Sequence, residues 1–227
     1  MTISFDGRRA VSAAEMQAID KASTERFGIH ADTLMENAGV AMAKELAATA
    51  KEDTRFLIVC GRGNNGGDGL VIARKLLDAG FETRAFILPP KGETYPPLVQ
   101  MNLKRALFKH VSVKELHSPG QLAEALKNCD IVVDALLGTG TAGAPSGLLA
   151  EAITAINAAA KTVAAADLPS GLNPDTGETC GPCVKAAKTF MLGLPKTGLL
   201  NEKARPFTGE LKLLNIGFPE ELLTGKK

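Results

Sequence analysis

The sequence contains no tryptophan, one tyrosine and only four cysteines among 227 residues. Four cysteines in a chain of this length do not make the disulfide framework of a small secreted protein. The net charge is +1 and no run of Lys or Arg exceeds two residues, which disfavours a sequence-independent nucleic-acid binder. No apolar stretch could span a membrane, and residues 1–9 lack the apolar core of a secretory signal. We therefore expect a cytoplasmic protein that binds neither nucleic acid nor membrane.

What the sequence does contain is an alternation of short apolar strands with helices. Strands are predicted at 55–60, 83–88, 111–116, 131–135, 162–167, 189–192 and 210–214. Helices are predicted at 12–24, 32–50, 68–79, 97–108, 118–128 and 145–159. This order predicts a three-layer, Rossmann-like, doubly wound α/β fold, with helices on both faces of a mostly parallel sheet. Because no linker or repeat interrupts the pattern, residues 1–227 are expected to form a single domain.

A glycine-rich segment at 61–69, Gly-Arg-Gly-Asn-Asn-Gly-Gly-Asp-Gly, follows the first of these strands. Its glycines would let the backbone approach a ligand closely, and the N-terminus of the next helix would favour a pyrophosphate. A tight turn alone would need fewer glycines. A redox dinucleotide site usually has an acidic residue at the end of the second strand, but that strand ends in Leu88-Pro89. The segment therefore predicts dinucleotide binding and disfavours a conventional NAD(P)-dependent oxidoreductase.

Two aspartates, Asp134 and Asp167, close apolar strands further along the chain. A buried carboxylate must be paired, hydrogen-bonded or bound to a cation, and Asp134 could simply cap local N–H groups. The carboxyl ends of parallel strands meet at one edge of a sheet, so both aspartates are expected near the glycine-rich segment. Together Asn65, Asp134 and Ser170 offer only hard oxygen ligands, which suit an alkali or alkaline-earth cation and not zinc.

Cys180 and Cys183 form a C-x-x-C sequence at the end of the Pro- and Gly-rich stretch 169–182, which is predicted to be a long loop. Redox-active pairs place the first cysteine at a helix N-terminus after a strand. Because this sequence lies in the loop, we interpret both as ordinary loop cysteines. Cys60 and Cys129 are predicted to be core residues.

Taken together, the motifs resemble the NAD(P)H-hydrate epimerase family, which has the fold of the YjeF amino-terminal domain. The matching segments run along nearly the whole chain, at 34–39, 63–69, 134–140, 167–171, 189–190 and 195–198. The resemblance implies an isomerase of metabolite repair that interconverts the R and S epimers of NADHX and NADPHX, the dinucleotides hydrated at C6 of the nicotinamide. Many bacterial members carry a dehydratase domain after this one. The sequence ends at Lys227, so a separate ADP- or ATP-dependent NAD(P)HX dehydratase is expected to use the product.

The resemblance also implies which residues form the site. The implied substrate contacts are Asn64, Asn65, Gly66, Gly67, Asp68, Gly138, Thr139, Gly140, Thr141, Ala142, Gly143, Ala144 and Asp167. It implies a homodimer, and a potassium ion held by Asn65, Asp134 and Ser170. Arg62 and Lys196 are expected to be solvated or locally paired charges.

The chemistry follows from the substrate, because the hydrogen on C6 is not acidic. We expect loss of the C6 hydroxyl, assisted by the ring nitrogen lone pair, and return of water to the other face. Asp167 is predicted to be the acid/base, with Asp68 second, and nearby carboxylates would stabilise the cation. The alternative is a catalytically inactive binding or dimerisation module of the same fold. The acidic residues of the motifs and the lack of a basic surface signal argue against it.

Overall fold

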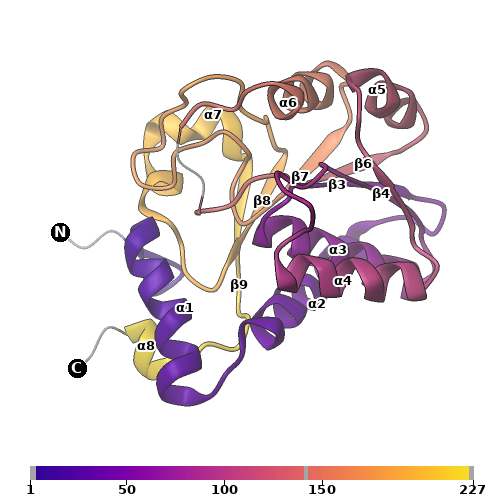
Figure 1. Ribbon diagram of the computed structural model, residues 1–227. Coiled ribbons are helices and arrows are strands. Elements are labelled where there is room, and N and C mark those ends of the chain that lie inside the picture. The colour runs from indigo at the N-terminus through magenta and orange to yellow at the C-terminus, as the bar shows by residue number, and fades with distance from the viewer. Residues whose placement is uncertain (1–3, 141–142, 225–227) are drawn as a thin grey trace.

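A seven-stranded sheet forms the centre of the computed structural model, which describes residues 4–140 and 143–224 (Figure 1). Its strands are β3 (Arg55–Cys60), β4 (Glu82–Ile87), β5 (Ser112–Glu115), β6 (Ile131–Ala135), β7 (Thr162–Ala166), β8 (Lys188–Leu192) and β9 (Glu210–Leu214). They lie in the order β5-β4-β3-β6-β7-β8-β9, and each neighbouring pair is parallel. The predicted α/β fold and all seven predicted strands are confirmed. A separate antiparallel pair, β1 (Ser4–Phe5) and β2 (Arg8–Arg9), precedes the sheet.

Helices cover both faces of the sheet (Figure 1). On one face lie α2 (Ala31–Thr49), α3 (Asn64–Asp78) and α4 (Pro97–Phe108), and on the other α5 (Pro119–Lys127) and α6 (Leu148–Ala158). The strands sort their side chains between these layers, because successive residues of a strand point to opposite faces. In β3, Ile58 is buried with the first group of helices and Leu57 with the second.

The loops after β3 and β6 touch where the winding of the sheet reverses. From β3 the chain winds toward β4 and β5, whereas from β6 it winds toward β7, and ligands of such sheets bind at this reversal. Gly61 N–H donates to the carbonyl of Ala135 at 2.8 Å. A Cβ on Gly61 would lie 1.8 Å from the carbonyl oxygen of Leu136, so only glycine permits this contact.

The start of α3 differs from the prediction, which placed it at Asp68. The helix begins at Asn64, with Gly63 as its N-cap. Gly66 and Gly69 lie inside it, where a Cβ would come 1.9 Å from Gly61 O and 2.7 Å from Ala135 Cβ, respectively. The glycines therefore let a helix pack closely on the sheet, and reading them as loop residues was wrong. The predicted start of α6 at Pro145 was also too early, because Gly147 is its N-cap.

The remaining elements complete the edges of the molecule. α1 (Ala13–Phe27) begins with the predicted Ser12–Glu15 capping box and lies beside α8 (Glu220–Thr224) (Figure 1). Two short 3-10 helices, at Thr197–Leu200 and Glu202–Ala204, and α7 (Arg205–Thr208) connect β8 to β9. The prediction contained none of these short helices, because each is under six residues long.

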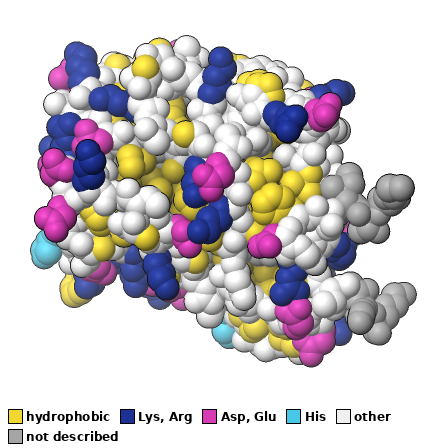
Figure 2. Space-filling model, turned by 180° about the vertical axis from the view of Figure 1, so that it is seen from behind, with side chains coloured by type: hydrophobic (Ala, Val, Ile, Leu, Met, Phe, Trp, Pro, Cys, Tyr) yellow, Lys and Arg dark blue, Asp and Glu magenta, His cyan; other side chains and the backbone are white. Residues whose placement is uncertain are grey.

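The cysteines and the surface agree with the sequence interpretation. Cys60 and Cys129 are buried in the core, whereas Cys180 and Cys183 lie unpaired in the loop before β8. On the face seen in Figure 2, Lys and Arg side chains are interspersed with Asp and Glu. Over the described part of the chain, no helix has both the length and the apolar character that crossing a membrane requires.

Candidate active site

A cavity of about 860 Å³ opens at the carboxyl edge of the sheet, where the winding reverses. Nine of the predicted contact residues line it, namely Asn64, Asn65, Asp68, Gly138, Thr139, Gly140, Gly143, Ala144 and Asp167. Gly66 and Gly67 do not line it, because both are buried within α3, and a Cβ on Gly67 would meet Met35 Sδ at 2.6 Å. Thr141 and Ala142 lie outside the described residues. The structure thus brings together most, but not all, of the predicted contacts.

Asp167 lies directly after β7, with a φ of +68°. This left-handed conformation is uncommon for a non-glycine residue, and such conformations cluster at functional sites. The Asp167 carboxylate accepts a hydrogen bond from Lys196 Nζ. Lys196 is 1% exposed and also donates to the carbonyl of Leu192 at 2.9 Å. Lys196 is therefore locally paired, one of the two expected alternatives, and its partner is a predicted site residue.

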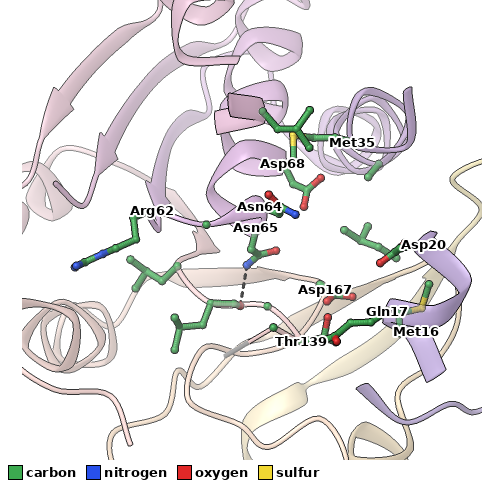
Figure 3. A pocket seen from close by; sticks show the side chains of 18 of the residues that line it. Met16, Gln17, Asp20, Met35, Arg62, Asn64, Asn65, Asp68, Thr139 and Asp167 are labelled. Atoms are coloured by element: carbon green, nitrogen blue, oxygen red, sulfur yellow. Dashed lines mark hydrogen bonds between the residues drawn. The ribbon is translucent and has the colours of Figure 1, made fainter. Parts of the chain in front are cut away.

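Asp68 enters the same end of the cavity from the first turns of α3 (Figure 3). Its side chain is half-buried, and within the described residues it forms no hydrogen bond or ion pair. Burial raises the pKa of Asp68 well above its ordinary value, and the charges of Asp167 and Asp20 raise it further, against the opposing effect of Lys196. Asp68 is therefore a carboxyl group that retains its proton more readily than an ordinary aspartate.

Asp20, which the sequence analysis did not identify, completes this end of the cavity. It lies on α1, and its carboxylate faces the space shared with Asp68 and Asp167 (Figure 3). Although Asp20 as a whole residue is exposed, partial desolvation of its carboxyl group in the cavity raises its pKa to about 6; Lys196 opposes this shift and Asp167 adds to it. The local sequence gives no signal for Asp20, because the start of α1 reaches this edge through contacts distant in the sequence, among them the bridge between Val11 and Lys196.

The three predicted cation ligands, Asn65 in the cavity wall and Asp134 and Ser170 behind it, belong to one hydrogen-bond network. Asp134 accepts from Ser170 Oγ at 2.6 Å and from Ser170 N at 2.8 Å. Ser170 Oγ in turn accepts from Leu137 N at 2.8 Å. Asn65 Nδ2 donates to the carbonyl of Leu137 at 2.8 Å, as the dashed line in Figure 3 shows. Asn65, Asp134 and Ser170 are thus neighbours around Leu137.

Two features decide whether this network suits a cation. Asn65 Oδ1 is buried and has no hydrogen-bond partner among residues 4–140 and 143–224, which leaves an oxygen free to coordinate an ion. Asp134 is fully buried, and burial raises its pKa to about 6, against the hydrogen bonds from Ser170 and Leu136. Asp134 therefore does cap local N–H groups, as the alternative interpretation supposed. The oxygen donors Asn65, Asp134 and Ser170 nevertheless fit a hard monovalent cation.

The opposite end of the cavity has a different character. Arg62 lines it, and its side chain points away from the carboxylates (Figure 3); Lys91 also lines the cavity. Between the two ends lies the N-terminus of α3 at Asn64, where backbone N–H groups favour an anion. The cavity therefore has an acidic end, an anion-binding middle and a basic end, an order that matches a dinucleotide.

Comparison with known proteins agrees with this arrangement. The family model described as "YjeF-related protein N-terminus" matches residues 31–198. The chain belongs to this family. The matched segment contains Asn65, Asp68, Asp134, Asp167 and Lys196, but it begins after α1 and so excludes Asp20.

Several curated relatives of the chain match most of its length. It is 40% identical over 220 residues to the NAD(P)H-hydrate epimerase of Elusimicrobium minutum, covering 95% of this chain and 99% of the relative. The NAD(P)H-hydrate epimerase of Rhodopirellula baltica is 38% identical, with 94% and 86% covered. The bifunctional NAD(P)H-hydrate repair enzyme Nnr of Moorella thermoacetica is 41% identical, but the match spans only 41% of that longer protein.

A solved structure confirms the fold of this family member. The crystal structure of the yeast protein ynu0 (YNL200c) superposes with a TM-score of 0.75 at 25% identity, covering 83% of this chain and 82% of that chain. The predicted family resemblance is thus confirmed by both sequence and structure.

Proposed function

We propose that this chain is an NAD(P)H-hydrate epimerase, an isomerase that interconverts the R and S epimers of NADHX and NADPHX. The observation that carries the proposal is the acidic end of the cavity, where Asp20, Asp68 and Asp167 surround one space. A cavity of about 860 Å³ is large enough for most of a dinucleotide. The names of the nearly full-length relatives support the same activity.

The binding mode follows from the three parts of the cavity. The pyrophosphate lies at the N-terminus of α3, where the N–H groups near Asn64 and Asn65 face it. The hydrated nicotinamide lies at the acidic end, against apolar side chains that include Met16 and Leu34. The adenosine lies toward Arg62.

The acidic end suits a reaction that passes through a cation. Loss of the C6 hydroxyl as water leaves an iminium, with positive charge shared by C6 and the ring nitrogen. Three carboxyl groups with one ammonium group, that of Lys196, form a negative surrounding for this charge. Fixed charges aimed at charge that develops during a reaction lower its barrier. The sequence analysis assigned the proton transfer to Asp167, but the ion pair with Lys196 favours a fixed charge there.

Potassium is proposed as the cofactor, with Asn65, Asp134 and Ser170 as ligands. The partnerless Asn65 Oδ1 and the all-oxygen donor set support this assignment. When bound, the ion would neutralise the Asp134 charge and tie the loop after β6 to the start of α3. We also propose a cytoplasmic homodimer whose product feeds a nucleotide-dependent dehydratase, because longer relatives are named bifunctional repair enzymes.

The test is an epimer-interconversion assay. Each purified epimer of NADHX and of NADPHX is incubated with the protein in potassium chloride or in tetramethylammonium chloride, and the epimers are separated by chromatography. We expect both epimers to reach the same mixture much faster with protein and potassium than without either. Absorbance at 340 nm with NADH and carbonyl acceptors should stay constant, which separates this enzyme from an oxidoreductase. Tight NADHX binding without interconversion would instead identify a binding module.

A further inference from the structure

We propose that Asp68 and Asp20 are the two proton-carrying groups, one for each face of the nicotinamide ring, and that Lys196 is a positioning residue that holds Asp167 as a fixed negative charge. The proposal rests on the epimerase function and names the groups that perform it. It differs from the sequence-based assignment of Asp167, and it adds two residues that the sequence analysis did not place in the site.

The three carboxylates differ in the partners that hold them. Asp167 is held by Lys196, which is buried and is itself fixed by the Leu192 carbonyl. Within the described residues, neither Asp68 nor Asp20 has a hydrogen bond or an ion pair. A group that must release and recover a proton in each turnover needs a free carboxyl, whereas a group that stabilises a cation needs a fixed one.

Asp68 and Asp20 are also placed to reach different faces of the nicotinamide ring. Inversion at C6 requires water to leave from one face of the ring and to return to the other. Asp68 comes from α3 and Asp20 from α1, and Figure 3 shows the two carboxyl groups on different walls of the same space. A ring between these walls presents one face to each group. A single carboxylate could not reach oxygen on both faces without a rearrangement of the ring or the protein.

Asp68 and Asp20 both bind a proton more readily than an ordinary aspartate. The pKa of Asp68 is raised well above its ordinary value, whereas that of Asp20 is raised to about 6. Both groups therefore bind a proton at higher pH than an ordinary aspartate, which suits groups that carry a proton in each turnover. The other ionisable groups around Asp68 are Asp167 after β7, Lys196 after β8 and the buried Cys60 thiol at the end of β3.

The step balances without an oxidant. The Asp68 carboxyl gives its proton to the C6 hydroxyl, the C6–O bond breaks, and its electron pair leaves with water. The lone pair of the ring nitrogen forms the N1–C6 double bond of the iminium. A water on the other face then adds its oxygen to C6 and gives a proton to Asp20, and the N1–C6 π electrons return to nitrogen. Proton exchange with solvent resets both carboxyl groups.

The test separates oxygen exchange from inversion, using each pure NADHX epimer in H₂¹⁸O. The wild-type protein should invert both epimers and introduce ¹⁸O into both. In Asp68→Asn, inversion should fall about 10²–10⁴-fold, while ¹⁸O exchange without inversion should continue for the one epimer whose hydroxyl faces Asp20. Asp20→Asn should show the same loss of inversion with exchange kept only for the opposite epimer.

Matched controls lie on the same helices. Asp78→Asn on α3 and Glu25→Gln on α1 remove carboxylates that pair with Lys109 at 3.2 Å and Lys21 at 3.7 Å, outside the cavity. Both should keep wild-type inversion. The proposal is overturned if Asp68→Asn or Asp20→Asn inverts at the wild-type rate, or if either abolishes exchange of both epimers. It is also overturned if Asp167→Asn loses inversion but keeps ¹⁸O exchange for only one of the two epimers. Failure of the wild-type protein to invert would overturn the epimerase function instead.

Lys196 has its own readout, the pH profile of kcat. Lys196 lowers the pKa of both Asp20 and Asp68. In Lys196→Met, the acidic and the basic limb of the pH profile should therefore both move to higher pH. The kcat at the optimum should fall at least about tenfold. Lys196→Arg, which keeps the charge, should restore the wild-type limbs. Because the buried site could destabilise the methionine variant, its melting temperature is measured alongside. A lower kcat with unmoved limbs in folded Lys196→Met would show a merely structural role.

Discussion

Asp134 near the end of β6 and Asp68 in the first turns of α3 both lie close to the switch point, yet their carboxyl groups have opposite surroundings. Burial raises the pKa of both. Asp134, however, accepts hydrogen bonds from Ser170 N, Ser170 Oγ and Leu136 N, whereas Asp68 accepts none from the described residues. A carboxylate that satisfies three donors holds two loops together, and one without donors is free to exchange a proton. The comparison therefore assigns structure to Asp134 and chemistry to Asp68.

The largest effect on stability is expected from Asp134→Ala. The substitution leaves the Ser170 N–H and Oγ–H and the Leu136 N–H without their acceptor in the buried network. We expect a loss of about 3 kcal/mol in the free energy of unfolding, because each buried donor left unpaired costs about 1–3 kcal/mol and the site partly relaxes. Denaturant unfolding measures it, with Asp68→Ala as the matched variant. Equal losses in the two variants would remove the contrast between Asp134 and Asp68.

A smaller effect on stability is expected from Asn65→Ala. This substitution tests whether the site around Asp134 binds a cation, which would set Asp134 further apart from Asp68. Potassium at roughly ten times its Kd should stabilise the wild-type protein by about 1.4 kcal/mol relative to tetramethylammonium. Asn65→Ala removes the partnerless Oδ1, so the stabilisation should disappear. The control is Asn64→Ala, which removes an exposed neighbour and should keep it. If Asn65→Ala is stabilised by potassium as strongly as the wild type, Asn65 is not a ligand.

The smallest effect is expected from Asp68→Asn, whose free energy of unfolding at pH 7 should equal or exceed that of the wild type. The raised pKa of Asp68 means that the folded state keeps a proton that the unfolded state releases above about pH 4. This contribution to stability is complete below about pH 4 and is lost as pH rises through the folded pKa. Unfolding curves from pH 4 upward should therefore show the wild type declining relative to Asp68→Asn. Parallel curves would indicate an ordinary carboxylate.

The same contrast shows how far the sequence could lead. The strands, Asp134, Asp167 and the network of Asn65 and Ser170 follow local patterns, because apolar runs end in polar residues at the carboxyl edge of the sheet. The glycines of 61–69 misled the prediction of where α3 starts, because glycine also allows a helix to pack closely on a sheet. Ala135, against which Gly69 packs, is distant in the sequence, so no local pattern shows this contact.

The rest of the site depends on contacts that no local pattern shows. Asp20 reaches the cavity through contacts distant in the sequence, among them the pairing of Val11 with Lys196, 185 positions away along the chain. Lys196 looked like an ordinary charge in the sequence, and only its burial against Asp167 reveals its place. The left-handed φ of Asp167 is likewise set by the surrounding fold.

The central claim is that the acidic end of the cavity stabilises a cation formed by breaking the C6–O bond. The most direct test is wild-type inversion of one pure NADHX epimer, run in parallel in H₂¹⁸O and in D₂O and followed by mass spectrometry. The account predicts that the inverted product carries solvent oxygen at C6 and no solvent deuterium on carbon. Inversion that retains the original oxygen and incorporates deuterium at C6 would contradict it, because the C–H bond and not the C–O bond would then be the one that breaks.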